Sequence, residues 1–377
     1  MAEIREILDK LNYYTEAPKR TIAEYTAKTG KGAVGIFAPY APEEIVHAAG
    51  LLPVGLWGAR IALNKARISM PTFACSIMQS IKELEVCGHY DQLIAVICNS
   101  LCDTLKAMGQ KWTKGDTIPL IHFTHAQHRD LPAAATYLAK EYGFIKERLE
   151  KLIGYEITEE ELLKSIDIYD EHRAVMREFA CVAAQYPDII DIRKRHLVFK
   201  SAFFMRKEEH TVLVKELIAA LKEQPVKPWE GKRFVFSGIM VEPDPVFDVF
   251  NDLGIAVAAD DLAQEGRQYR TDNGKEGDAL TRLAAQWINF VGCLAFDPKK
   301  PRIQMLADMV KESKADGLIV AMMKFCDPEE FDYPLIKRKM EEENIPLIQI
   351  EIDQQIETTE QLRTRLQSFV EMLDAKE

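Results

Sequence analysis

Residues 316–331 read DGLIVAMMKFCDPEEF and decide the predicted fold. Residues 317–322 form an apolar run with the length of a buried strand, and a Cys-Asp pair follows at Cys326. The pattern occurs earlier too, where the apolar run 93–97 is followed by residues 98–103, CNSLCD. Ligands bind beyond the carboxyl ends of strands in open parallel sheets. The sequence therefore predicts that both Cys-Asp pairs lie where a ligand or a reaction centre would be.

The chain of 377 residues is too long for one ordinary core, which favours two α/β domains of about 150 residues each and a connecting element. The net charge of -11 argues against a nucleic-acid partner, because such a partner requires a basic face. The charged N-terminus and the absence of any apolar stretch near ~18 residues predict a cytoplasmic protein without a membrane partner. Seven cysteines in a chain of this size indicate reduced thiols or metal ligands.

Alternating strand and helix patterns predict an α/β fold with two parallel-sheet, Rossmann-like domains joined by a helical connector. The expected domains are an N-terminal α/β domain with a helical arm at 1–157, the connector at 158–228 and a C-terminal α/β domain at 229–377. The arm consists of two helices within 1–29. We expect strands over 33–38, 53–57, 93–97, 118–123, 233–237, 255–259, 317–322 and 346–350. We expect helices over 42–50, 75–85, 103–110, 131–152, 246–253, 277–290, 303–313, 333–343 and 360–373.

The cysteines fall into two groups. Three are expected to be small buried apolar residues, and Cys98 is ambiguous; the three are Cys87, Cys181 and Cys293. The others share a junction between a loop and a helix: Cys75, Cys102 and Cys326. A helix N-terminus there favours a thiolate. Their spacing matches no compact ferredoxin or zinc ribbon, so spacing alone leaves structural thiols as the favoured interpretation over a metal site.

Three further signals favour ordinary interpretations. The G-x-G-x-x-G match at 30–35 precedes a strand, so it indicates a turn, and no phosphate loop for ATP is found. The histidines spaced by three favour structural or surface roles over zinc; they are His122, His125 and His128. A charged cluster follows the strand 255–259, where solvated loop charges are favoured over a ligand site; its residues are Asp260, Asp261, Glu265, Arg267 and Arg270.

Several motifs resemble the 2-hydroxyacyl-CoA dehydratase family, specifically its β subunits. They are 73–79 FACSIMQ, 102–105 CDTL and 322–330 MMKFCDPEE, with further likeness at 42–50, 53–55, 204–210 and 259–264. The resemblance covers essentially the whole chain. The motif sequences are most similar to those of the (R)-2-hydroxyisocaproyl-CoA dehydratases within the family. Residues 124–127 read THAQ where the family commonly has His-Pro-Gln.

The resemblance implies a [4Fe-4S] cluster between the two α/β domains, held by Cys75, Cys102 and Cys326. Three protein ligands leave one iron open to a non-protein ligand. The implied reaction removes water from an (R)-2-hydroxyacyl-CoA to give an (E)-2-enoyl-CoA. One electron enters the thioester carbonyl, the ketyl radical expels the hydroxyl, the β-proton leaves and the electron is returned. The reaction is therefore a hydro-lyase reaction without net redox change.

The same resemblance implies the partners. The chain would pair with an α subunit as a heterodimer and accept or relay an electron from an ATP-dependent iron-sulfur activator. The substrate would bind mainly through the α subunit, so no acid-base residue is assigned here. Two alternatives stay open: a subunit of a related CoA-ester reductase or double-cubane cluster reductase, and a zinc-stabilised or metal-free α/β ligand-binding module.

Overall fold

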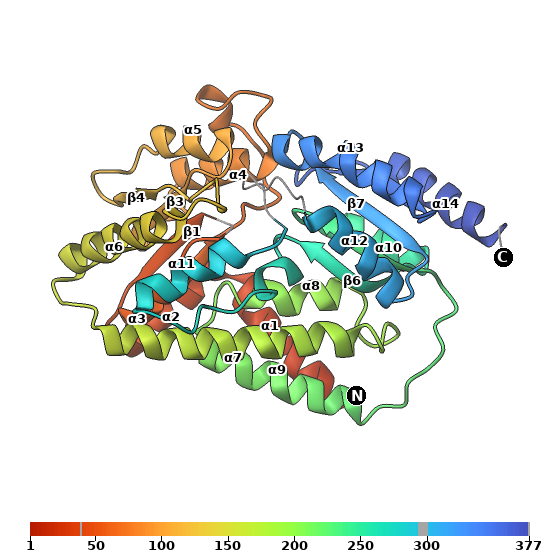
Figure 1. Cartoon of the computed structure of the whole chain (residues 1–377), viewed down its shortest axis with the longest axis horizontal. Coiled ribbons are helices and arrows are strands. Elements are labelled where there is room, and N and C mark those ends of the chain that lie inside the picture. The colour runs from red at the N-terminus through yellow and green to blue at the C-terminus, as the bar shows by residue number, and fades with distance from the viewer. Residues whose placement is uncertain (38–39, 293–300, 376–377) are drawn as a thin grey trace.

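The computed structural model describes residues 1–37, 40–292 and 301–375. Within them the strands form two four-stranded parallel sheets, which lie in the two halves of Figure 1. The first sheet has the order β2-β1-β3-β4, and its strands are β1 (Ala33–Phe37), β2 (Leu52–Leu56), β3 (Leu93–Asn99) and β4 (Leu120–Phe123). The second has the order β6-β5-β7-β8, and its strands are β5 (Arg233–Gly238), β6 (Ala256–Leu262), β7 (Gly317–Met323) and β8 (Leu347–Ile352). The predicted α/β class with two parallel sheets is confirmed.

The two sheets have the same strand order, so each has a switch point beside its first strand. In the first sheet β1 pairs with β2 and β3, and in the second β5 pairs with β6 and β7. Every residue of β7 is buried, as its continuous apolar sequence predicts for a strand covered on both faces. The carboxyl ends of β3 and β7 therefore lie beside the positions where parallel sheets bind ligands.

Helices cover both sheets and separate their strands. The first half contains α3 (Glu43–Ala48), α4 (Ser76–Val86), α5 (Asp103–Lys111) and α6 (Ala134–Ile153), with a short 3₁₀ turn η1 (Ala66–Ile68). The second contains α10 (Asp244–Asp252), α11 (Ala279–Asn289), α12 (Pro301–Glu312), α13 (Asp327–Glu342) and α14 (Glu360–Asp374), with a 3₁₀ turn η2 (Gly266–Tyr269). Helix α11 packs against α6, so it contacts the first half.

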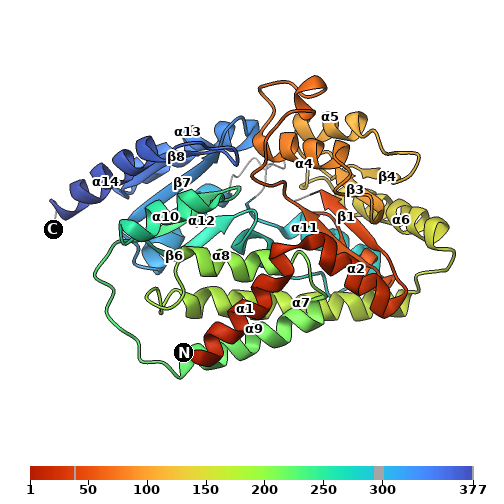
Figure 2. The same ribbon diagram turned by 180° about the vertical axis from the view of Figure 1, so that it is seen from behind.

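The N-terminal arm packs on the connector and forms a helical layer with it. The arm contains α1 (Ala2–Glu16) and α2 (Pro18–Thr29), and the connector contains α7 (Glu159–Ala183), α8 (Ile192–Ser201) and α9 (Lys207–Lys222). Figure 2 shows α1 lying beside α8 and α9. The apolar face of α1 is buried in a core shared with these helices. The connector helices are interrupted between Ala183 and Ile192 and again between Ser201 and Lys207.

Two predicted boundaries are wrong in ways that matter for the site. Strand β6 continues to Leu262 and does not end at residue 259, because buried arginines pair its acidic residues. Helix α13 begins at Asp327 and not at residue 333, because Pro328 is tolerated in a first helical turn. The predicted end of the first strand at Ala38 lies outside the described residues.

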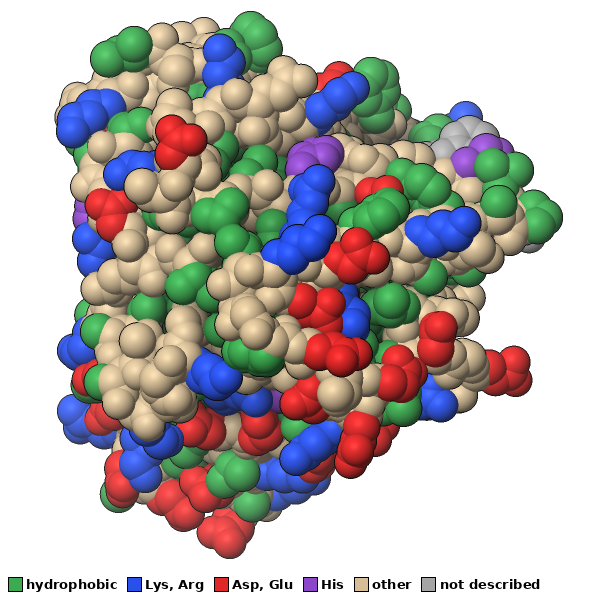
Figure 3. Space-filling view, turned by 90° about the vertical axis from the view of Figure 1, so that its left-hand side faces the viewer, with side chains coloured by type: hydrophobic (Ala, Val, Ile, Leu, Met, Phe, Trp, Pro, Cys, Tyr) green, Lys and Arg blue, Asp and Glu red, His purple; other side chains and the backbone are tan. Residues whose placement is uncertain are grey.

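The surface is mixed in charge. On the side that Figure 3 shows, lysine and arginine side chains are interspersed with aspartate and glutamate side chains. This distribution agrees with the net charge of -11. No helix among the described residues is long and apolar enough to cross a membrane.

Candidate metal centre

Three cysteines begin three helices and line one cavity. Cys75 is the N-cap of α4, Cys102 the N-cap of α5 and Cys326 the N-cap of α13. All three line a cavity of about 70 Å³. Two of the helices come from the first half of the chain and the third from the second. The structure thus brings together the residues that the sequence singled out, between the two sheets.

The N-cap of α5 is one of these cysteines. The Sγ atom of Cys102 accepts a hydrogen bond from the backbone N–H of Leu105 at 3.4 Å. The Cys102 sulfur therefore lies at the positive end of the α5 dipole, where a negative charge is stabilised. A thiolate at this position would be held by the helix as well as by a metal.

Burial has the largest effect on the pKa of each of the three thiols. It raises the pKa of Cys75 to about 12, against the smaller lowering effect of the backbone N–H groups of Met78 and Ile77. Burial also raises the pKa of Cys102, and it raises the pKa of Cys326 well above its usual range. The thiolate expected at Cys75 is therefore wrong for the chain by itself, because the apolar surroundings outweigh the helix dipole. Negative charge here needs a positive counterpart.

The rest of the cavity wall is mostly apolar. Its other residues are Tyr40, Trp57, Ile77, Met78, Leu101, Leu105, Ile239, Arg267, Met323 and Pro328. Arg267 is the single charged residue in this set, and its guanidinium already donates to Asp261, to Glu329 and to the carbonyl of Gly238. The cavity is therefore a mostly apolar, thiol-lined site with little polar competition for a metal.

The donor set fits an iron-sulfur cluster better than a single ion. Thiolates are the soft ligands that clusters, zinc and Cu(I) prefer. Among the described residues, no three Cys, His, Asp or Glu side chains converge closely enough to hold one ion. Ligands of a cluster bind different iron atoms, so they need not converge on one point. Cys75, Cys102 and Cys326 are thus the residues that could hold such a group.

The other cysteines that the structure describes are not among the residues that line this cavity. Cys98 is buried inside β3, where burial raises its pKa to about 12. Cys87 and Cys181 are exposed, so the prediction that they are buried is wrong. Cys87 is the C-cap of α4 and Cys181 lies in α7, and the apolar character of cysteine does not reveal that either position faces solvent. Cys293 lies outside the described residues.

The other sequence signals give no metal site. His122 and His128 are exposed, whereas His125 is buried and stacks on Trp287 with ring centroids 3.9 Å apart. The glycine-rich stretch 30–35 is a helix end followed by a strand, since Gly30 caps α2 in a left-handed conformation and β1 begins at Ala33. Both ordinary interpretations are confirmed.

The acidic residues after residue 259 are buried, so the expected solvated loop is wrong. Asp260 and Asp261 lie inside β6 and are 7% and 0% exposed. Arg195, from the connector, pairs with Asp260, and Arg302 donates to Asp261 at 2.8 Å. Arg302 also donates to Glu329, in the first turn of α13, at 2.7 Å. This network therefore holds the start of α13, and with it Cys326, against the second sheet.

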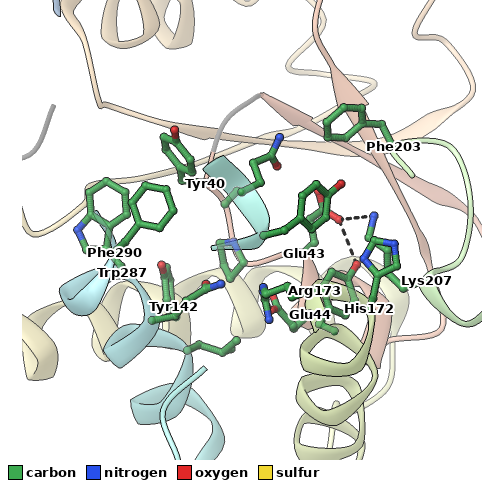
Figure 4. Close-up of a pocket in the computed structure, with 17 residues that line it drawn as sticks. Tyr40, Glu43, Glu44, Tyr142, His172, Arg173, Phe203, Lys207, Trp287 and Phe290 are labelled. Atoms are coloured by element: carbon green, nitrogen blue, oxygen red, sulfur yellow. Dashed lines mark hydrogen bonds and ion pairs between the residues drawn. The ribbon is translucent and has the colours of Figure 1, made fainter. Parts of the chain in front are cut away.

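A second pocket, of about 70 Å³, lies next to the cysteine cavity and shares Tyr40 with it. Figure 4 shows Tyr40, Trp287 and Phe290 on one side of it. On the other side Glu43 accepts hydrogen bonds from Lys207 at 3.0 Å and from the hydroxyl of Tyr169 at 3.1 Å. Sequence reasoning missed this pocket because its wall comes from both halves of the chain and from the connector.

Comparison with known proteins now decides the family. A family model described as "2-hydroxyglutaryl-CoA dehydratase, D-component" matches residues 39–373. The chain belongs to this family. The resemblance inferred from the motifs is confirmed, and the member is a dehydratase subunit, which is part of a hydro-lyase.

Three relatives of this dehydratase subunit match along nearly their whole length. The "Lactoyl-CoA dehydratase subunit beta" of Anaerotignum propionicum is 52% identical, covering 99% of this chain and 100% of the relative. The "(R)-phenyllactyl-CoA dehydratase beta subunit" of Clostridium sporogenes is 43% identical, covering 95% and 96%. The "(R)-2-hydroxyglutaryl-CoA dehydratase, subunit beta" of Acidaminococcus fermentans is 35% identical, covering 98% and 100%.

Proposed function

We propose that this dehydratase subunit is a β subunit that binds a [4Fe-4S] cluster through Cys75, Cys102 and Cys326. The observation that carries the proposal is the convergence of three helix N-caps, all cysteines, on one apolar cavity. The three helix N-termini favour the negative charge that three thiolates bring to such a group. The all-sulfur donor set supports a cluster over a hard cation.

The bound cluster would supply one-electron chemistry, which the elimination of water from a 2-hydroxyacyl-CoA requires because no carbonyl directly acidifies the β-proton. The residues of this chain have a different task. The buried Arg267 and Arg302 hold the start of α13, and the mostly apolar wall surrounds the three cysteines. The subunit would thus provide a rigid, largely apolar electron site.

We also propose that an α subunit and an ATP-dependent iron-sulfur activator are the partners of this chain. The enzyme would act in the cytoplasm, in an anaerobic fermentation of amino acids. The names of the three relatives, all β subunits, support the α partner. The missing phosphate loop supports a separate protein as the site of ATP hydrolysis. The acyl substrate is a 2-hydroxyacyl-CoA, which the family resemblance places mainly on the α subunit, and for that reason no acid-base residue is assigned in this chain.

The test is the iron and acid-labile sulfide content of the chain purified without oxygen, alone and with its α subunit. We expect about four irons per chain, as a [4Fe-4S] cluster requires, and loss of this iron in Cys326→Ala. The matched control is Cys181→Ala, whose exposed thiol lies in the connector and away from the cavity. It should keep the iron of the wild type.

Two outcomes would contradict the proposal. One is an iron-free chain even beside its α subunit, and the other is equal iron loss from Cys181→Ala and Cys326→Ala. A dehydratase and a CoA-ester reductase are separated by the product. With the α subunit, the activator and ATP, a 2-hydroxyacyl-CoA should give an enoyl-CoA without net consumption of reductant.

A further inference from the structure

The indole N–H of Trp57 is buried without a partner in the wall of the cysteine cavity. Trp57 follows β2 directly, is 5% exposed and lines the cavity together with Cys75, Cys102 and Cys326. Its Nε1 atom has no hydrogen-bond acceptor among the described residues. Since a buried unpaired N–H costs about 1–3 kcal/mol, the arrangement needs an explanation.

The other three tryptophans of the chain make the indole hydrogen bond that Trp57 lacks. Each donates its indole N–H to a backbone carbonyl: Trp112 to Ile118 at 2.9 Å, Trp229 to Gly254 at 3.2 Å and Trp287 to Ala126 at 3.1 Å. Trp57 is the fourth tryptophan and the exception. Trp57 therefore differs from them in lacking a carbonyl acceptor, and it is the tryptophan among the residues that line the cysteine cavity.

The Trp57 ring is held in place. Its backbone carbonyl accepts a hydrogen bond from the amide of Gln354 at 2.9 Å, and its ring packs on Phe203 with centroids 5.5 Å apart. Gly58 follows with φ +75°, and a Cβ atom there would lie 2.0 Å from the Oγ atom of Ser80. The backbone beside the ring is thus tightly confined, and the ring has little freedom to reach another acceptor.

Other polar groups in the cavity wall are already occupied. The guanidinium of Arg267 donates to Asp261, Glu329 and the carbonyl of Gly238. Tyr40 takes part in interactions of its own with other residues, among them ring contacts with Trp287 and Phe290. Trp57 is a side-chain donor of the wall that has no acceptor among the described residues, so it is available to whatever the cavity binds.

We propose that the indole N–H of Trp57 donates a hydrogen bond to a sulfur of the cluster bound by Cys75, Cys102 and Cys326. This inference rests on the proposed function. Hydrogen bonds to cluster sulfurs stabilise the more negative, reduced state and so raise the reduction potential. Trp57 is thus a tuning residue that makes the cluster easier to reduce, and it adds a side-chain donor to the backbone N–H groups that already face the thiols.

The experiment compares the wild type with Trp57→Phe, which keeps an aromatic ring and removes the N–H. The control is Trp112→Phe, which removes an indole N–H bonded to a backbone carbonyl away from the cavity. Each protein is purified without oxygen with its α subunit, assayed for iron, and titrated by redox potential with the EPR signal of the reduced cluster as readout. We expect equal iron in all three and a more negative midpoint potential for Trp57→Phe alone.

The outcomes separate the two proposals. An iron-free wild type overturns the proposed function. Full iron with the same midpoint potential in Trp57→Phe and Trp112→Phe overturns the role of Trp57 and leaves the proposed function standing.

A second measurement needs no substitution at Trp57. Wild-type protein labelled with ¹⁵N at the tryptophan indole should show one ¹⁵N coupling to the reduced cluster by pulsed EPR. Absence of this coupling in an iron-loaded protein overturns the inference, even where Trp57→Phe fails to fold.

Discussion

Gln354 and Ser80 join the two halves of the chain beside the cysteine cavity. The Oγ atom of Ser80, in α4, donates to the Oε1 atom of Gln354, which follows β8, at 2.9 Å. The Nε2 atom of Gln354 donates to the carbonyl of Trp57 at 2.9 Å, and its backbone N–H donates to the Oγ atom of Ser76 at 3.0 Å. These bonds link the second sheet to the helix that begins at Cys75. Hydrogen bonds between protein groups therefore hold the two sides of the cavity together without a metal.

We expect Gln354→Leu to lower the free energy of unfolding by about 1–3 kcal/mol, because it removes the bond to Ser80 and leaves the Trp57 carbonyl buried without the Gln354 amide. Urea unfolding of the metal-free chain measures this change. Gln367→Leu is the control, since Gln367 is exposed on α14 and bonds only to Glu371 within its helix. If the two variants unfold at the same urea concentration, Gln354 does not hold the halves together.

Cys102 allows the capping role and the metal role to be separated. Cys102→Ala removes the acceptor for the Leu105 N–H, so the metal-free chain should lose about 0.5–2 kcal/mol of stability. Cys102→Ser restores a good N-cap and should recover that stability, yet still lose the iron. Thermal unfolding of the metal-free proteins and iron analysis check the two effects. Iron retained by Cys102→Ser at the wild-type level would contradict the assignment of this ligand.

The sequence predicts the position of the cavity well because its signals are local. Apolar runs that end in Cys-Asp predict strand ends at β3 and β7, and the structure places Cys102 and Cys326 just beyond them. The start of α13 was missed because Pro328 and Pro334 obscure its helical pattern. A proline is acceptable within the first turn, but periodicity alone cannot distinguish that case from a loop.

The buried charges could not be predicted, because their partners are distant in the chain. Asp260 and Asp261 resemble loop residues by composition, yet Arg195 and Arg302 reach them from the connector and from α12. Trp57 is a similar case. Its sequence context predicts a strand end, whereas its unpaired N–H is visible only once the cavity is formed. Local sequence patterns predict the helices and strands. The side-chain contacts of the site form between segments that are distant in the chain, so these patterns do not predict them.

The network around Asp261 supports a prediction of stability. Burial by itself would raise the pKa of Asp261, but the guanidinium groups of Arg267, Arg302 and Arg270 together hold it well below its usual range. Asp261→Asn leaves three buried or half-buried arginines without their shared partner and should cost about 3–5 kcal/mol. Chemical denaturation measures this. Asp248→Asn, at a largely exposed ion pair with Arg193, should cost less than about 1 kcal/mol; equal losses would contradict the importance of the network.

His172 and His210 predict a dependence of stability on pH. Their rings are buried, with the Nε2 atom of His172 2.9 Å from the Nδ1 atom of His210. Burial lowers the pKa of His210 to about 3, and burial together with His210 holds the pKa of His172 well below its usual range. Below about pH 6.5 the unfolded chain takes up protons that the folded chain does not. Stability is therefore complete above that pH and is lost as the pH falls.

The free energy of unfolding should fall between pH 7 and pH 5 by up to ~1.4 kcal/mol per pH unit for each such histidine. His172→Gln should make this slope shallower, because one group that binds a proton only in the unfolded chain is removed. His89→Gln is the control, since His89 is exposed, and it should keep the wild-type slope. Urea unfolding at several pH values measures the three slopes. A folded His172→Gln with an unchanged slope would show that His172 already carries its proton in the folded chain, and the burial argument would then be wrong.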